Sequence, residues 1–106
     1  MAMSSPVTIQ LTKAIRAHGE DVDQITFREL TTKDVIELGL PTLFIPGADG
    51  QSPGIELRQP IIARYISRLA AIPMNSVEQL TLRDHSACTS AIMSFFGMGD
   101  GDQPTN

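Results

Sequence analysis

The sequence is poor in cysteine, aromatic residues and long apolar runs. A single cysteine among 106 residues excludes an internal disulfide and a cysteine-rich zinc site, and it suits a reducing cytoplasm. The chain has no Trp, one Tyr and four Phe. Its apolar runs span only a few residues, and its N-terminus lacks the basic and apolar parts of a signal peptide. We therefore expect no membrane span and no secretory leader.

Positive charge is also scarce. Eight Lys and Arg residues stand against twelve Asp and Glu residues, which gives a formal net charge of −4. An acidic chain repels phosphate, and this counts against a nucleic-acid binder. Ile, Leu, Val and Phe nevertheless supply 28 of the 106 residues, more than a disordered chain contains. The composition therefore predicts one folded domain.

The N-terminal part has the pattern of a β-hairpin. Val7, Ile9 and Leu11 alternate with polar residues, as in a half-buried strand. Residues 18–23 predict a turn that holds Gly19 and three acidic residues, before a second strand around Ile25. This hairpin would have a loop longer than the tightest types, and it needs helices against its apolar face.

The middle of the chain predicts a short helix, a loop and a short strand. Thr31 or Thr32 caps a helix that ends at Gly39. The prolines and glycines of residues 42–54 predict an irregular loop, in which residues 43–45 form an apolar plug. The alternation that follows, with Ile and Leu at positions 55 and 57, suggests a third short strand.

The C-terminal half predicts helices. Pro60 fits the first position of an amphipathic helix that Pro73 ends. Asn75 or Ser76 would cap a single turn. The last helix runs from about Leu82 to Phe96, starts after Thr81 with Asp84 in its first turn, and stops at Gly97.

These elements predict an α+β fold. An N-terminal β-hairpin, with a third short strand, packs on three or four helices. Residues 1–6 form a flexible N-terminus, 7–97 the domain and 98–106 a disordered tail. The expected core consists of Val7, Ile9, Leu11, Ile25, Phe27, Ile62, Tyr65, Ile66 and Leu69.

Residues that carry catalysis or bind metals are few, so we predict no enzyme, no cofactor and no metal site. His85 and Cys88 share a helix face, but zinc needs at least three protein ligands and a Cys–His nucleophile needs an oxyanion hole. The acidic cluster Glu20, Asp21 and Asp23 has too few oxygens at fixed spacing for calcium, and we interpret it as a solvated turn.

Two further features lack the residues that a nucleotide or DNA site needs. The glycines of residues 47–54 have no Lys-Ser/Thr after them, so they form no phosphate loop. Arg64 and Arg68 make a basic stripe too small for DNA.

The last helix is apolar over about 200° of its circumference, whereas a surface helix needs a stripe of about 100° or slightly more. Two interpretations stay open: the helix is wedged between two internal neighbours, or one edge is left over for a partner. The second interpretation makes Ala91, Ile92, Phe95 and Phe96 the partner-binding residues.

The order of segments resembles a phage family. The chain is similar to the tail assembly chaperones of contractile-tailed, Mu-like phages, prophages and tailocins. The segments that carry this similarity are, in order, VTIQLTKAI, an acidic turn, ITFRELTTKDVIELG, a Pro/Gly loop, IARYISRLAAIPMNSVEQLTLRDHSA and AIMSFFG. The resemblance covers about residues 7–97, and its strongest parts are ITFREL-TTKDV and ARYISRLAAIP…VEQLTLRD. The loop over residues 41–53 and the acidic tail after Gly97 depart from the family pattern.

The resemblance implies a non-enzymatic chaperone that binds the tape-measure protein and keeps it soluble while the tail tube assembles. It also implies a place in the host bacterial cytoplasm and absence from the mature virion. A second copy of this chain is the other partner that we consider, and we expect neither nucleic acid nor membrane. The alternative function is a small helical DNA-binding regulator, although the last helix lacks Arg, Lys, Asn or Gln at base-reading positions.

Overall fold

A computed structural model describes residues 6–47 and 54–97. The elements are β1 (Val7–Ala17), β2 (Glu20–Phe27), α1 (Thr32–Leu38), β3 (Thr42–Ile45), β4 (Gly54–Leu57), α2 (Gln59–Ala70), α3 (Met74–Val77) and α4 (Leu82–Phe95). The strands form two separate antiparallel hairpins, β1–β2 and β3–β4. The α+β class and the N-terminal hairpin on helices are confirmed. The predicted tail and the N-terminus before Pro6 lie outside the described residues.

The turn of the β1–β2 hairpin is shorter than predicted. Only His18 and Gly19 separate the strands, with φ angles of 55° and 79°. Positive φ at both positions is the type I′ geometry, whose twist matches that of paired strands. The prediction of a longer turn over residues 18–23 is therefore wrong. Its three acidic residues instead lie on β2, where Asp21 pairs with Arg16 across the strands at 3.0 Å.

A bulge interrupts β1. The register pairs Gln10 with Gln24 and then Ile15 with Val22, so β1 holds three residues more than β2 over this stretch. The backbone of the bulge turns toward the start of α4, where Asp84 accepts hydrogen bonds from the N–H groups of Thr12 and Lys13. The side chain of Asp84 thus replaces ladder bonds that the bulge removes.

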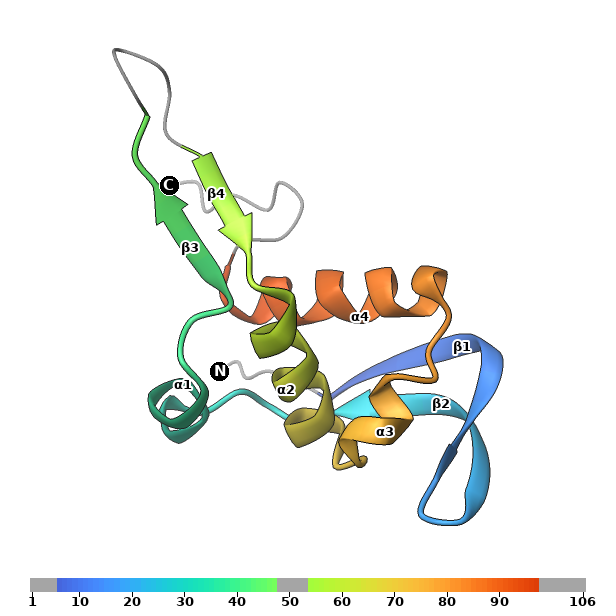
Figure 1. The fold of residues 1–106 in the computed structure, drawn as a ribbon. Coiled ribbons are helices and arrows are strands. Elements are labelled where there is room, and N and C mark those ends of the chain that lie inside the picture. The colour runs from blue at the N-terminus through green and yellow to red at the C-terminus, as the bar shows by residue number, and fades with distance from the viewer. Residues whose placement is uncertain (1–5, 48–53, 98–106) are drawn as a thin grey trace.

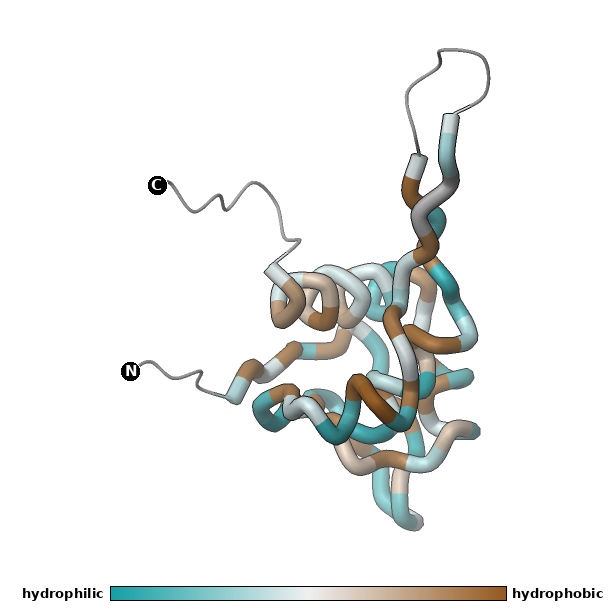
Figure 2. Tube along the Cα trace, turned by 90° about the vertical axis from the view of Figure 1, so that its left-hand side faces the viewer, coloured by the Kyte–Doolittle hydropathy of each residue, from teal (hydrophilic) through white to brown (hydrophobic). Residues whose placement is uncertain are grey.

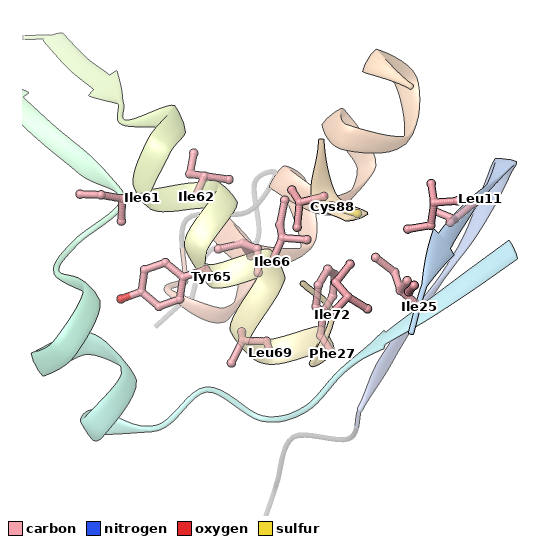
Figure 3. Close-up of a cluster of buried hydrophobic side chains, with 14 residues drawn as sticks. Leu11, Ile25, Phe27, Ile61, Ile62, Tyr65, Ile66, Leu69, Ile72 and Cys88 are labelled. Carbon is pink, nitrogen blue, oxygen red and sulfur yellow. The ribbon is translucent and has the colours of Figure 1, made fainter. Parts of the chain in front are cut away.

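The core lies between α2 and the inner face of β1–β2, with α4 closing it (Figures 1 and 3). Of the predicted core, Val7 and Ile9 are only half-buried, and the other seven residues are buried. Ile15 and Ala17 are buried although they were not predicted to be in the core, because β1 runs farther than expected. The nine-residue list of the expected core also omits six further buried apolar residues, which are Ile61, Ile72, Val77, Cys88, Ile92 and Met93.

Asp34 joins three elements around the end of the core. It lies in the first turn of α1, where Thr31 is the cap, and is almost fully buried. Arg28, just beyond β2, donates two hydrogen bonds of 2.9 Å to it, and Arg68 of α2 donates one of 3.3 Å. The hydrogen bonds from Arg28 outweigh the effect of burial and hold the pKa of Asp34 well below its ordinary value.

The second hairpin corrects the prediction of an irregular loop over residues 42–54. The segment Thr42–Ile45 is strand β3, which pairs with β4 from Thr42 opposite Leu57 to Ile45 opposite Gly54. Turn-forming residues follow β3 rather than interrupt it, which leaves four residues free to pair. The predicted third strand exists as β4, but it pairs with β3 instead of joining the N-terminal hairpin. Figure 1 shows this hairpin standing away from the body of the domain.

Helix starts follow the predicted signals with one exception. Thr31 and Thr81 cap α1 and α4, and Pro60 lies in the first turn of α2. Neither Asn75 nor Ser76 caps α3, which begins directly after Pro73. Ser76 is buried and donates to the backbone oxygen of Arg16 instead, because this oxygen lies at the edge of β1, where it needs a donor.

Candidate partner-binding site

The four predicted site residues lie on the last turns of α4, and none is fully exposed. Ile92 is entirely buried in the core, so it has no surface to offer a partner in this structure. Ala91, Phe95 and Phe96 are half-buried and pack against the core. Whether they contact a partner stays a prediction.

Phe96 is tied to the core through Tyr65. The two rings meet edge to face, with centroids 5.5 Å apart and an interplanar angle of 87°. The hydroxyl of Tyr65 donates to the backbone oxygen of Gly39 at the end of α1. The final turn of α4 is therefore held to α2, and through it to α1.

The outward face of α4 is built from small residues. Ser86, Ala87, Ser90 and Ser94 are exposed there. From His85 to Gly97 the sequence contains no Asp, Glu, Lys or Arg, although solvent-facing helix surfaces usually carry charge. The predicted site residues came from the apolar arc of this helix, and no binding role was predicted for Ser86, Ser90 or Ser94 on the polar strip. The absence of charge on the opposite face is the signal that could have identified this surface.

A hollow separates this face from the projecting β3–β4 hairpin. Ile55 and Leu57 of β4 are 60% and 42% exposed, and both side chains line it. Ile9 of β1 lines it as well, and its volume is about 650 Å³. The residues that α4 contributes are Ala87, Thr89, Ser90, Ala91, Met93 and Ser94. Figure 2 shows that apolar stretches of chain continue from the body into the projecting hairpin.

A second hollow, of about 1000 Å³, adjoins the first and lies between α2, α3 and the start of α4. Leu57, Thr89 and Ser90 line both hollows. Among the described residues that line the second hollow, Glu78 is the one acidic residue, and His85 of α4 lines this hollow as well. We call the two hollows together the α4 groove.

The groove contains no catalytic or metal-binding arrangement among the residues described. Cys88 is fully buried beneath it, and burial, followed by the charge of Asp84, raises the pKa of its thiol to about 12. Such a thiol is a poor nucleophile. Within residues 6–47 and 54–97, no three His, Cys, Asp or Glu side chains come together as metal ligands. The described residues of the groove thus present mainly apolar and hydroxyl side chains rather than reactive groups.

The sequence was compared with known families and proteins. The model of the family described as phage tail assembly chaperone proteins, E, or 41 or 14, matches residues 8–97, which is most of the chain. The chain belongs to this family. No curated protein and no solved structure matched it.

The resemblance to tail assembly chaperones is thereby confirmed. Membership of a chaperone family favours a non-enzymatic role and a phage tail protein as partner. In the parts of the phage tail assembly chaperone that the structure describes, no helix is both long and apolar enough to cross a membrane.

Proposed function

We propose that this phage tail assembly chaperone binds the tape-measure protein and keeps it soluble until the tail tube has assembled around it. The observation that carries the proposal is the α4 groove, an apolar surface that the described residues leave uncovered in a chain of a tail assembly family. We further propose that it acts in the host bacterial cytoplasm and is absent from the mature virion.

The physical need is the coverage of apolar surface. A long tape-measure chain has extended amphipathic helices without a core, and their apolar stripes would associate with one another before assembly. A small domain that covers such stripes reversibly prevents this by helix-in-groove contact. α4 provides the contact in this proposal, with Ala91 in the groove and Phe95 and Phe96 at its C-terminal end.

The alternative of a DNA-binding regulator gains no support. Arg28 and Arg68 are engaged by Asp34, and Arg16 by Asp21. These guanidinium groups would have to leave their partners to contact phosphate, and the outward face of α4 beyond His85 bears no charge at all.

Co-purification tests the proposal. The affinity-tagged chain is co-expressed with the tape-measure protein encoded in the same tail gene cluster, and the complex is isolated at moderate salt. We expect the two proteins to elute together from size exclusion. Separate elution, with the chain folded by circular dichroism, would contradict the proposal.

A further inference from the structure

Building on the proposed function, we infer that the α4 groove binds one amphipathic helix of the tape-measure protein, which is the client of the chaperone. This helix is about three turns long and contacts the groove through an apolar stripe that carries no charge. Four observations support this occupant: the absence of charge in the hollow beside β3–β4, the helical backbone of its floor, the length of the groove and the surfaces of the chain's own helices.

Charge restricts the occupant first. In the hollow beside β3–β4, every lining residue that the structure describes is apolar or a neutral Ser or Thr. An acidic or basic side chain entering it would lose water without gaining a partner of opposite charge, which is costly. The matching surface of the client is therefore uncharged. Glu78 and His85 lie only in the adjoining hollow, so polar ends of a client helix fit that side.

Backbone chemistry favours a helix over an extended segment. The floor of the groove is α4, whose backbone groups are bonded within the helix. An extended client segment lying on it would bury N–H and C=O groups without partners, whereas a helix satisfies its own. The floor residues Ala87, Ser90, Ala91 and Ser94 recur at helical spacing and are small. Small side chains let a second helix approach closely.

The length of the groove sets the length of the client helix. The lining residues of α4 run from Leu82 to Ser94. At a rise of 1.5 Å per residue this stretch is about 18 Å long, which corresponds to about three helical turns. One wall is the β3–β4 hairpin, a two-stranded sheet of the kind that is marginal in water without cover. A bound helix would cover Ile55 and Leu57.

A second copy of the chain does not fit this description. Among the described helices, α2 and α4 bury their apolar stripes. α1 exposes Ile36, at 76%, but it has seven residues and places Lys33 and Glu37 beside it. The outward face of α4 beyond His85 is uncharged, but its exposed residues are Ser and Ala. A second copy would therefore bring no large apolar side chains into the groove, whereas an apolar helix of the tape-measure protein would.

The first test uses one substitution on the floor of the groove and one on its hairpin wall. Ser90→Arg fills the point where the hollows meet, and Ile55→Asp puts a charge on the hairpin wall; both side chains are exposed, so the fold is kept. Ala14→Arg, an exposed position on β1 outside the groove, is the matched control. Circular dichroism and thermal melting check the fold of each variant. We expect the dissociation constant for the tape-measure protein to rise at least tenfold for both groove variants and less than twofold for Ala14→Arg.

A second test identifies the occupant. Cys88 is buried and unreactive, so Ser90→Cys provides a single accessible thiol for a photoactivatable crosslinker. We expect crosslinks to a tape-measure segment with apolar residues at helical spacing. Crosslinks to a second copy of this chain, or to a segment without that spacing, would overturn the inference.

The two proposals fail in different ways. If wild type binds the tape-measure protein and both folded groove variants bind it equally well, the groove inference is wrong and the proposed function stands. If wild type does not bind it, the proposed function is wrong and the groove inference falls with it.

Discussion

The carboxylate of Asp84 accepts hydrogen bonds from the backbone N–H of Thr12, at 2.9 and 3.0 Å to its two oxygens. This carboxylate also accepts from the Thr12 hydroxyl at 3.0 Å and from the N–H of Lys13 at 3.3 Å. Burial alone would raise the pKa of Asp84, but the hydrogen bonds from Thr12, Lys13 and Thr81 together lower it. The first turn of α4 and the bulge of β1 are thus one structural unit, although they lie far apart in the sequence.

Asp84→Asn is expected to loosen this unit. The amide has one acceptor oxygen in place of two, and its NH₂ group cannot accept from a backbone N–H. We expect a lower melting temperature and faster amide hydrogen exchange at Thr12 and Lys13. Asp23→Asn, which removes an exposed carboxylate from β2, should leave exchange at both positions unchanged. Equal exchange in the two variants would show that Asp84 does not support the bulge.

Ile66→Ala tests the core. Ile66 is fully buried on α2 between the hairpin and α4, and removing a buried Ile side chain costs about 2–5 kcal/mol of unfolding free energy. Ile36→Ala is the control, because Ile36 is largely exposed and should cost less than about 0.5 kcal/mol. Chemical denaturation of both variants checks this. A loss of unfolding free energy below half a kcal/mol for Ile66→Ala would show that Ile66 does not pack in the core as described.

Asp34 should make stability depend on acid pH. Its pKa is lowered from an ordinary value of 3.8 in the folded chain, chiefly by Arg28. Above about pH 5, Asp34 is ionised in both the folded and the unfolded chain, and its stabilising effect is complete. As the pH falls through the pKa of Asp34 in the unfolded chain, the unfolded chain takes up the proton first, and the folded state loses stability. Unfolding free energies measured between pH 2 and 7 should show this fall. Asp34→Asn should have a shallower acid slope, and an unchanged slope would contradict the assignment.

Cys88 should be inert in the folded chain. Burial raises the pKa of its thiol to about 12, so the thiol stays protonated at pH 8, and the side chain has no exposed surface. A thiol-reactive disulfide reagent should modify native protein far more slowly than protein unfolded in guanidinium. Comparable rates in the two states would place the thiol at the surface.

Phe95 and Phe96 test the end of α4. Both are half-buried, and Phe96 contacts Tyr65. We expect Phe95→Asp and Phe96→Asp to differ, so that one unfolds the domain and the other keeps the fold but loses the tape-measure protein. Circular dichroism and co-purification of each variant decide this. If both variants unfold, this end of the helix is ordinary core; if both fold and bind, it is not a contact surface.

Local signals predicted much of the fold. Thr81 and Asp84 indicated the start of α4, and the apolar stripe with Tyr65 and Ile66 indicated the buried face of α2. The bulge of β1 was beyond prediction because Asp84, which stabilises it, looks like an ordinary first-turn acid in the sequence. The strand β3 was obscured by the prolines and glycines near it, although its four residues are free of both.

The candidate site was predicted only in part. Apolar spacing directed attention to Ile92, Phe95 and Phe96, which the domain buries wholly or partly. Small residues such as Ser90 carry no periodic hydrophobic signal, so the outward face of α4 was overlooked. The opposite wall depends on β3 pairing with β4, which places Ile55 and Leu57 beside α4. The position of this hairpin beside α4 depends on tertiary contacts, so local sequence patterns could not predict it.

The soluble fraction of the tape-measure protein is the sharpest test of the proposal that this chain keeps it soluble. The tape-measure protein is expressed with wild-type chain, with the folded Ser90→Arg variant or with no partner, and its soluble fraction is measured after centrifugation. We expect the tape-measure protein to be mostly soluble with the wild-type chain and mostly aggregated in the other two cases. An equal soluble fraction with and without wild-type chain would contradict the account.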